Sequence, residues 1–251
     1  MQFSSAGNGA ITQLLGEEAQ KLLKELRFLI VGLGGLGSFV ATELVYLGAQ
    51  KLILVDNDRV SRSNLNRQIL YGIHDVGKSK VLVASRRLKE INPFISVETF
   101  DTKLTKMNAN YLVDKADVVI DCSDNFETKR LLNRVCFNKR KMLISGAVGS
   151  WEGWVASFPF YKDEDVSCLE CLFPGDLETL KEITEPAGQT LVTTVGAVAT
   201  FQVNEVIKLI SGQGENLEGK TLIIDTKTNQ CAVVKLTKNP QCPVCSSSPS
   251  E

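Results

Sequence analysis

The stretch FLIVGLGGLG at 28–37 decides the fold, because an apolar strand pattern runs directly into a glycine-rich turn. Glycine turns tightly and lets bare backbone N–H groups approach phosphate oxygens, and the N-terminus of the helix that follows favours negative charge. Asp56 follows 19 residues after Gly37, at the end of the next apolar run, where a carboxylate accepts hydrogen bonds from ribose hydroxyls. The sequence therefore predicts a nucleotide site whose phosphates lie against Gly32, Gly34, Gly35 and Gly37.

Apolar runs alternate with helical patterns over the first 150 residues. Predicted strands cover 27–31, 51–55, 95–100, 117–121 and 141–147, and predicted helices cover 11–26, 35–47, 77–91, 107–114 and 125–138. The alternation indicates an α/β fold with a Rossmann-like, doubly wound, mostly parallel sheet that binds ligands at the carboxyl ends of its strands. After residue 150 the pattern changes to strands at 151–158, 221–226 and 231–236 and an apolar helix at 195–211, which predicts an antiparallel extension of the sheet.

The bulk properties of the chain limit its organisation and its partners. With 251 residues it is long enough for one large domain and its core. We expect an N-terminal arm and helix at 1–26, a main domain with a nucleotide-binding half at 27–150 and a second half at 151–245, and a disordered tail at 246–251. Lysine and arginine number 28 against 29 aspartate and glutamate, which predicts no nucleic-acid or membrane partner. The first residues show no export signal, and no apolar run approaches a membrane span, which predicts a cytoplasmic protein.

The seven cysteines include two C-x-x-C pairs, CLEC at 168–171 and CPVC at 242–245. Four thiolates in two such pairs form a tetrahedral zinc site, which has no open position for catalysis. The sequence thus predicts a structural Zn²⁺ ion that joins the C-terminal tail to the long loop at 162–193, with the ligands Cys168, Cys171, Cys242 and Cys245. The remaining cysteines lie in or beside apolar segments, where free cysteine is usually buried, and are expected in the core: Cys122, Cys136 and Cys231.

The segment SRSNLNRQ at 61–68 follows the second predicted strand, near the phosphate end of a bound nucleotide. A guanidinium such as that of Arg67 binds phosphate oxygens in a bidentate manner. Lys80, at the start of the next predicted helix, brings an ammonium within reach of a bridging or terminal phosphate oxygen. The candidates for nucleotide contact in this region are Asn64, Arg67, Gln68 and Lys80. Arg62 and Lys78 are interpreted instead as solvated surface residues.

The segment DCSDN at 121–125 ends a predicted strand at the same edge of the sheet. A carboxylate beside a triphosphate is typical of a magnesium site, because Mg²⁺ takes one or two carboxylates together with phosphate oxygens. Asp124 is the candidate magnesium ligand. Asp121 has two interpretations, a cap for the following helix or a functional group. His74 is the one histidine of the sequence and is assigned no role.

These motifs together resemble the ThiF/MoeB/HesA family, relatives of the ubiquitin-activating enzymes, from about residue 17 to Cys245. The resemblance implies an ATP- and magnesium-dependent adenylation domain at 27–245 that acts on a small ubiquitin-like sulfur-carrier protein ending in Gly-Gly. It implies that a separate sulfur donor attacks the acyl-adenylate. It assigns the ribose to Asp56, the phosphates to Asn64, Arg67 and Lys80, the magnesium ion to Asp124, and zinc to the four cysteines. A homodimer is expected from the resemblance and from the apolar helix at 195–211, whose other interpretation is an ordinary core helix.

The sequence departs from the family pattern in two places. Members usually carry R-Y-x-R-Q before the first helix, with an arginine that reaches the partner subunit's nucleotide, whereas this chain has FSSAGN at 3–8. Many members also have a cysteine in the loop before the last large helix, where this chain has Thr184 or Glu185. We therefore expect adenylation without a thioester step. Two alternatives are a degenerate activator that only binds a carrier or peptide, suggested by the missing arginine, and an NAD-dependent oxidoreductase, supported by the glycine loop and Asp56.

Overall fold

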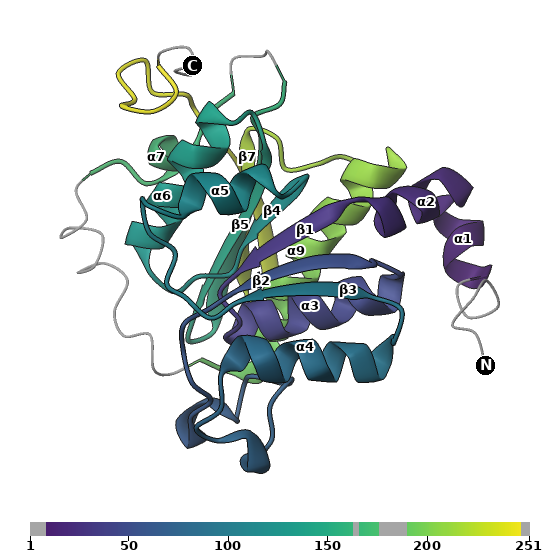
Figure 1. Cartoon of the computed structure of the whole chain (residues 1–251). Helices are drawn as coiled ribbons and strands as arrows, with labels where there is room; N and C mark the ends of the chain where they lie inside the picture. The colour runs from purple at the N-terminus through teal and green to yellow at the C-terminus, as the bar shows by residue number, and fades with distance from the viewer. Residues whose placement is uncertain (1–8, 163–165, 176–189, 247–251) are drawn as a thin grey trace.

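A mixed sheet forms the centre of the protein. The computed structural model describes residues 9–162, 166–175 and 190–246 (Figure 1). The strands in these ranges are β1 (Arg27–Val31), β2 (Lys51–Val55), β3 (Ser96–Phe100), β4 (Val118–Asp121), β5 (Met142–Gly149), β6 (Glu152–Pro159), β7 (Lys220–Asp225) and β8 (Gln230–Lys235). Their order across the sheet is β3-β2-β1-β4-β5-β6-β7-β8. The pairs among the first five are parallel and the three later pairs are antiparallel, which confirms the predicted fold class.

Helices cover both faces of this sheet (Figure 1). Their bounds are α1 (Gly9–Leu15), α2 (Glu17–Glu25), α3 (Gly35–Leu47), α4 (Lys80–Ile91), α5 (Ala109–Asp114), α6 (Phe126–Asn138), α7 (Leu169–Leu172) and α9 (Val192–Ser211), with short 3₁₀ turns η1 (Arg62–Asn64) and η2 (Ile73–Asp75). In β1, Phe28 and Ile30 pack with α3, α4 and α9, whereas Leu29 and Val31 pack with α5 and α6. Successive strand residues face opposite sides, so this uninterrupted apolar strand serves two cores.

Two predicted helices differ from the observed ones at glycine. The single helix predicted at 11–26 is wrong, because Gly16 has φ +88° and separates α1 from α2. The helix predicted from residue 77 begins instead at Lys80, because Gly77 has φ +85° and belongs to the preceding turn. L side chains rarely adopt such positive φ values, so glycine marks both breaks.

The apolar helix α9 belongs to the core along one face. It lies against α3, β5 and β6, and its buried residues include Val195, Val198 and Val206. This agrees with the core interpretation of the helix on that face. No helix in the described ranges is long and apolar enough to cross a membrane.

The free cysteines outside the two C-x-x-C pairs have different surroundings. Cys122 and Cys136 are buried, as predicted. The prediction that Cys231 is buried is wrong, because it lies on β8, where every residue is exposed. An apolar pattern cannot tell a covered strand from an edge strand, and β8 is the last strand of the sheet.

Candidate functional site

The glycine loop between β1 and α3 packs tightly against its surroundings. Gly32 has φ +90°, and a Cβ there would lie 2.8 Å from the carbonyl oxygen of Cys122 at the end of β4. A Cβ on Gly37 would overlap the carbonyl oxygen of Gly32. At Gly35 a Cβ would lie 3.1 Å from Val195 of α9. Gly32 and Gly37 are therefore glycine because the loop must fit between β4 and α3, which brings the loop beside the DCSDN segment.

Asp56, directly after β2, accepts a hydrogen bond from the backbone of the glycine loop. Its Oδ2 accepts the Leu33 N–H at 2.6 Å, and its Oδ1 accepts the Asp58 N–H at 2.7 Å. Burial raises the pKa of Asp56, and the nearby Lys80 ammonium opposes that rise. Each carboxylate oxygen can accept a second hydrogen bond. The geometry is thus compatible with the predicted contact between Asp56 and a ribose hydroxyl.

Lys80 begins α4 and extends to the same place. Its side chain is 4% exposed, and its Nζ lies 2.8 Å from Oδ2 of Asp58. Its backbone N–H also donates to the carbonyl oxygen of Asp58 at 3.1 Å. The sequence reasoning missed Asp58, although VDND carries two carboxylates two residues apart. Lys80 therefore pairs with Asp58 beside the glycine loop, and its charge also acts on the Asp56 carboxyl.

The 61–68 segment approaches the loop mainly through its last residue. Gln68 is buried, and its Nε2 lies 3.6 Å from the position of a Cβ on Gly34. Among the described residues its Oε1 has no hydrogen-bond partner, so an acceptor beside the loop stays open. Arg67 instead donates from Nη1 to the carbonyl oxygen of Ser63 at 3.2 Å.

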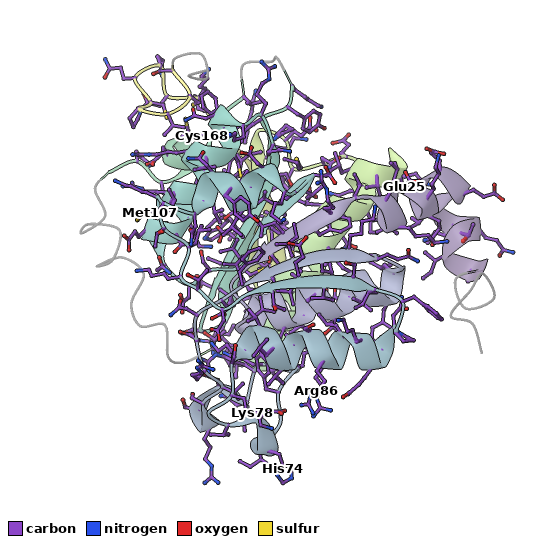
Figure 2. The ribbon with its side chains drawn as sticks, in the orientation of Figure 1. Glu25, His74, Lys78, Arg86, Met107 and Cys168 are labelled. Carbon is purple, nitrogen blue, oxygen red and sulfur yellow. The ribbon has the colours of Figure 1, made fainter. Side chains whose placement is uncertain are left out.

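The predicted surface residues of this region lie where expected, because Arg62 and Lys78 are exposed. Asn64 ends η1, and its carbonyl oxygen accepts hydrogen bonds from the backbone N–H groups of Arg67 and Gln68. His74 is also exposed, on the loop that carries Lys78. Figure 2 shows His74 and Cys168 at opposite ends of the view.

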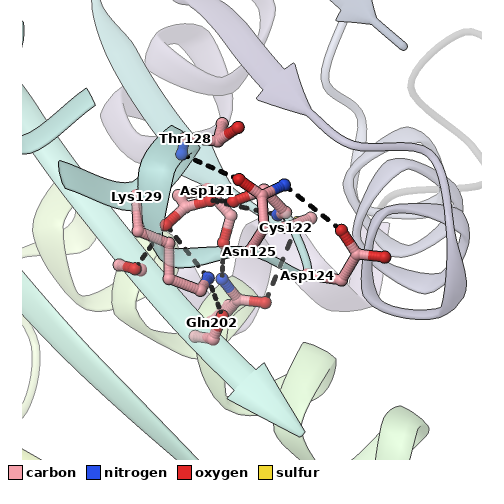
Figure 3. A network of polar contacts seen from close by, with 10 residues as sticks. Asp121, Cys122, Asp124, Asn125, Thr128, Lys129 and Gln202 are labelled. Carbon is pink, nitrogen blue, oxygen red and sulfur yellow. Dashed lines mark hydrogen bonds and ion pairs between the residues drawn. The ribbon is translucent and has the colours of Figure 1, made fainter. Parts of the chain in front are cut away.

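The DCSDN segment contains two carboxylates with different surroundings (Figure 3). Asp121 is fully buried, and its Oδ2 accepts from Lys129 Nζ at 3.1 Å and from Ser145 Oγ at 2.6 Å. The cap of α6 is Asn125, whose Oδ1 accepts the Thr128 N–H at 2.9 Å, so the capping interpretation of Asp121 is wrong.

Asp124 is exposed at the same edge, and Asn125 Nδ2 donates to its Oδ1 at 3.3 Å. A solvated carboxylate with remaining acceptor positions suits a hard cation such as Mg²⁺. The backbone of Cys122 lies against Gly32 in the same loop, so Asp124 belongs to the edge that carries the glycine loop.

The four predicted zinc ligands come together between α7 and the C-terminal segment. Their sulfur atoms all lie within 4.8 Å of one another, with 3.5 Å from Cys168 to Cys242 and 3.4 Å from Cys171 to Cys245. Zn–S bonds of about 2.3 Å in a tetrahedron separate sulfurs by about 3.8 Å, so the cluster fits zinc. Hydrogen bonding from Cys245 holds the pKa of Cys168 below its ordinary value.

Helix α6 supports this cluster from one side. Asn133 Oδ1 accepts the Leu169 N–H at 3.0 Å, and Arg130 pairs with Glu170 at 3.0 Å. The cluster is closed, since three of its cysteines are buried and Cys171 is half-buried. The predicted replacements at Thr184 and Glu185 and the FSSAGN segment lie outside the described residues.

Comparison with known proteins matches nearly the whole chain. The sequence model of the ThiF family matches residues 8–244. The chain is 36% identical over 244 residues to the sulfur carrier protein adenylyltransferase of Thermus thermophilus, covering 94% of this chain and 88% of that protein. It is 37% identical over 229 residues to the molybdopterin-synthase adenylyltransferase of Escherichia coli, covering 91% and 90%. It is also similar to the crystal structure of E. coli MccB with ATP, with a TM-score of 0.79 and 26% identity over 91% of this chain and 69% of that chain.

Proposed function

Because this chain belongs to the ThiF family, we propose that it uses ATP to adenylate the C-terminal glycine of a small ubiquitin-like sulfur-carrier protein. The observation that carries the proposal is that the glycine loop with its Asp56 contact, the Lys80–Asp58 ion pair and the 121–125 segment lie at one edge of the sheet. Relatives that share 36% and 37% identity with this chain bear the name adenylyltransferase. An NAD-dependent oxidoreductase would not need the 121–125 segment or the 61–68 segment.

The reaction requires little acid–base chemistry. A carboxylate oxygen of the carrier's last glycine bonds to the α-phosphorus of ATP, the bond to the bridging oxygen of pyrophosphate breaks, and pyrophosphate leaves. The nucleophile is already an anion, so no general base is required. The protein's task is to align two anions and offset their charge. The N–H groups of the glycine loop, Arg67 and Lys80 supply donors and positive charge, and Asn64 and Gln68 complete the contacts.

Magnesium and zinc would take separate places. Bound Mg²⁺ would neutralise phosphate charge at the nucleotide, and Asp124 is the residue that would hold it. Zn²⁺ would occupy the four-cysteine cluster as a structural ion, because four thiolates leave no position for a substrate.

An exposed apolar sheet face supports binding of the carrier protein. Trp154 of β6, Ile223 of β7 and Ala232 of β8 are in register on one row, and Val234 lies on the same face of β8. Ile223 is 43% and Val234 is 44% exposed. These strands continue the sheet beyond β5, which adjoins β4 and its 121–125 segment. We place the carrier on this face, with its C-terminal glycine reaching the nucleotide edge.

The cysteines support adenylation as the last step on this chain. Cys122 and Cys136 are buried, and burial raises the pKa of both thiols. A thiolate nucleophile needs exposure and a lowered pKa. Cys231 is exposed on an edge strand, but it pairs in register with Ile224 and does not lie in the loop where family members carry their cysteine. A separate sulfur donor would therefore attack the acyl-adenylate.

A second copy of the chain is the proposed occupant of a groove formed by α1, α3 and α9. The groove has a volume of about 400 Å³ and is lined largely by apolar side chains. Leu14 and Tyr46, which line the groove, are 71% and 58% exposed, so the helices of one chain do not cover them. The family likeness and this apolar groove together support a homodimer.

The function is tested by ATP–pyrophosphate exchange with a small carrier protein that ends in Gly-Gly. We expect exchange with the intact carrier and none with a carrier that lacks its final glycine, because the terminal carboxylate of the shortened chain ends about 3.5 Å short of the α-phosphorus. Carrier binding without exchange would instead identify the chain as a degenerate activator.

A further inference from the structure

The glycine loop is held by a side chain that lies outside all of the sequence motifs. Tyr71 is buried, and its hydroxyl donates to the carbonyl oxygen of Leu33 at 2.7 Å. The two residues are 38 positions apart in the sequence. On its other side Leu33 donates its N–H to Asp56 at 2.6 Å. Both peptide units that flank Leu33 are therefore fixed by side chains.

The orientation of one peptide unit decides where its N–H points. The unit between Leu33 and Gly34 is planar and trans, so its carbonyl and its N–H point in opposite directions. Because Tyr71 binds the carbonyl, the N–H of Gly34 is directed away from Tyr71. In the described part of the chain, no acceptor receives this N–H. An unpartnered N–H at the start of α3 is the kind of group that binds a phosphate oxygen.

The loop needs such a restraint because glycine stands on both sides of Leu33. Turning the peptide unit between Leu33 and Gly34 changes ψ of Leu33 and φ of Gly34, and glycine adopts positive and negative φ values with nearly equal ease. This peptide unit can therefore rotate at little cost. Tyr71 suits the task since burial, and after it the charges of Asp56 and Asp58, raise its pKa and keep the hydroxyl protonated as a donor.

We propose that Tyr71 is a positioning residue for the nucleotide site, which holds the Gly34 N–H toward the phosphates by fixing the Leu33 carbonyl. The inference rests on the proposed function, because it assumes that the glycine loop binds polyphosphate. Ligands with a polyphosphate group depend on the Gly34 N–H for binding. Adenosine has no phosphate and does not use this N–H.

The test is Tyr71→Phe, which keeps the ring and removes the hydroxyl. Binding of ATP, inorganic tripolyphosphate and adenosine is measured by calorimetry, with Tyr111→Phe on exposed α5 as the matched control. We expect Tyr71→Phe to weaken ATP and tripolyphosphate about tenfold and to leave adenosine within twofold of the parent. The control should bind all three ligands as the parent does.

The contradicting outcomes separate this inference from the proposed function. A parent that binds neither ATP nor tripolyphosphate would overturn both. A parent that binds ATP, with Tyr71→Phe within twofold of it, would overturn the role of Tyr71 alone. Equal weakening of ATP and adenosine would also overturn it, because that result indicates general loosening. If the variant does not fold, the ¹⁵N spectrum of the parent decides: tripolyphosphate should shift the Gly34 amide resonance, and an unshifted resonance would refute the inference.

Discussion

Asp121 and Asp124 are three residues apart, yet the fold gives them opposite surroundings. Asp121 is fully buried and ion-paired with Lys129, whose side chain is 2% exposed. Such a pair orders the segment around it, since Ser123 donates both its N–H and its hydroxyl to Asp121. Asp124 then extends from an ordered segment into solvent. Burial of one carboxylate thus fixes the place of the other.

Asp124→Ala is expected to lower the rate of ATP–pyrophosphate exchange at least a hundredfold. Loss of a metal ligand leaves phosphate charge uncompensated, which costs about 3 kcal/mol or more in the transition state. Glu127→Ala is the control, because Glu127 is an exposed carboxylate in the first turn of α6. Undiminished exchange in Asp124→Ala, with ATP still bound, would remove Asp124 from the site.

At the scale of elements, the buried carboxylate of Asp75 connects the loop between β2 and α4 to α4 itself. Asp75 is 2% exposed at its side chain and lies 2.8 Å from Arg86 and 3.5 Å from Lys78. Burial raises the pKa of Asp75, but the Gly72 N–H and the cations Arg86, Lys78 and Arg87 outweigh it and hold the pKa below the ordinary 3.8. The carboxylate therefore ties η2 to α4, the helix that carries Lys80.

Asp75→Asn is expected to lower the free energy of unfolding by about 1–2 kcal/mol at pH 7, because the cations lose a charged partner but stay partly solvated. A carboxyl whose folded pKa is depressed stabilises fully above its unfolded pKa and loses that contribution as the pH falls through the folded pKa. The gap between variant and parent should thus be constant down to about pH 4 and close below it. Urea unfolding across this range measures it, with Asp114→Asn at an exposed ion pair as the control. A gap that widens on acidification would contradict the assignment.

The zinc cluster joins elements that are distant in sequence. A Cys242→Ser/Cys245→Ser double variant is expected to lose one Zn²⁺ per chain and to unfold at a lower temperature, because closing a long loop through a metal contributes directly to folding. Metal analysis and thermal unfolding provide the measurement, and Cys231→Ser, outside the cluster, should change neither. Freshly purified, reduced parent protein without zinc would rule the metal out.

The molecule as a whole has an apolar groove on the helix-covered face opposite α5 and α6. Light scattering at micromolar concentration is expected to give twice the chain mass of 27.5 kDa. Tyr46→Glu should shift the mass toward the monomer, because a charge in an apolar interface is costly to desolvate. Tyr111→Glu, on exposed α5, should not. A monomeric parent would end the dimer proposal.

The sequence by itself determined the order of elements, the parallel sheet and the identity of the four clustered cysteines. The spacing of apolar residues and the positions of glycines are local signals, which neighbouring residues already carry. The observed bounds of β1 and β2 are the ones that these signals predicted. The C-x-x-C pairs were equally local, since each pair carries its own spacing. The same local pattern failed at Gly16, which looked like part of one helix, and at Cys231, because edge position is set by strand order and not by the residues of the strand.

The tertiary structure alone decided which polar groups face each other. Asp58 meets Lys80 across 22 residues and Tyr71 meets Leu33 across 38, and no spacing in the sequence encodes either contact. It also decided that Asp121 is buried and Asp124 exposed. Hydrogen bonds and ion pairs act over about 3 Å, so they depend on where the chain returns after folding, whereas apolar periodicity is already present in neighbouring residues.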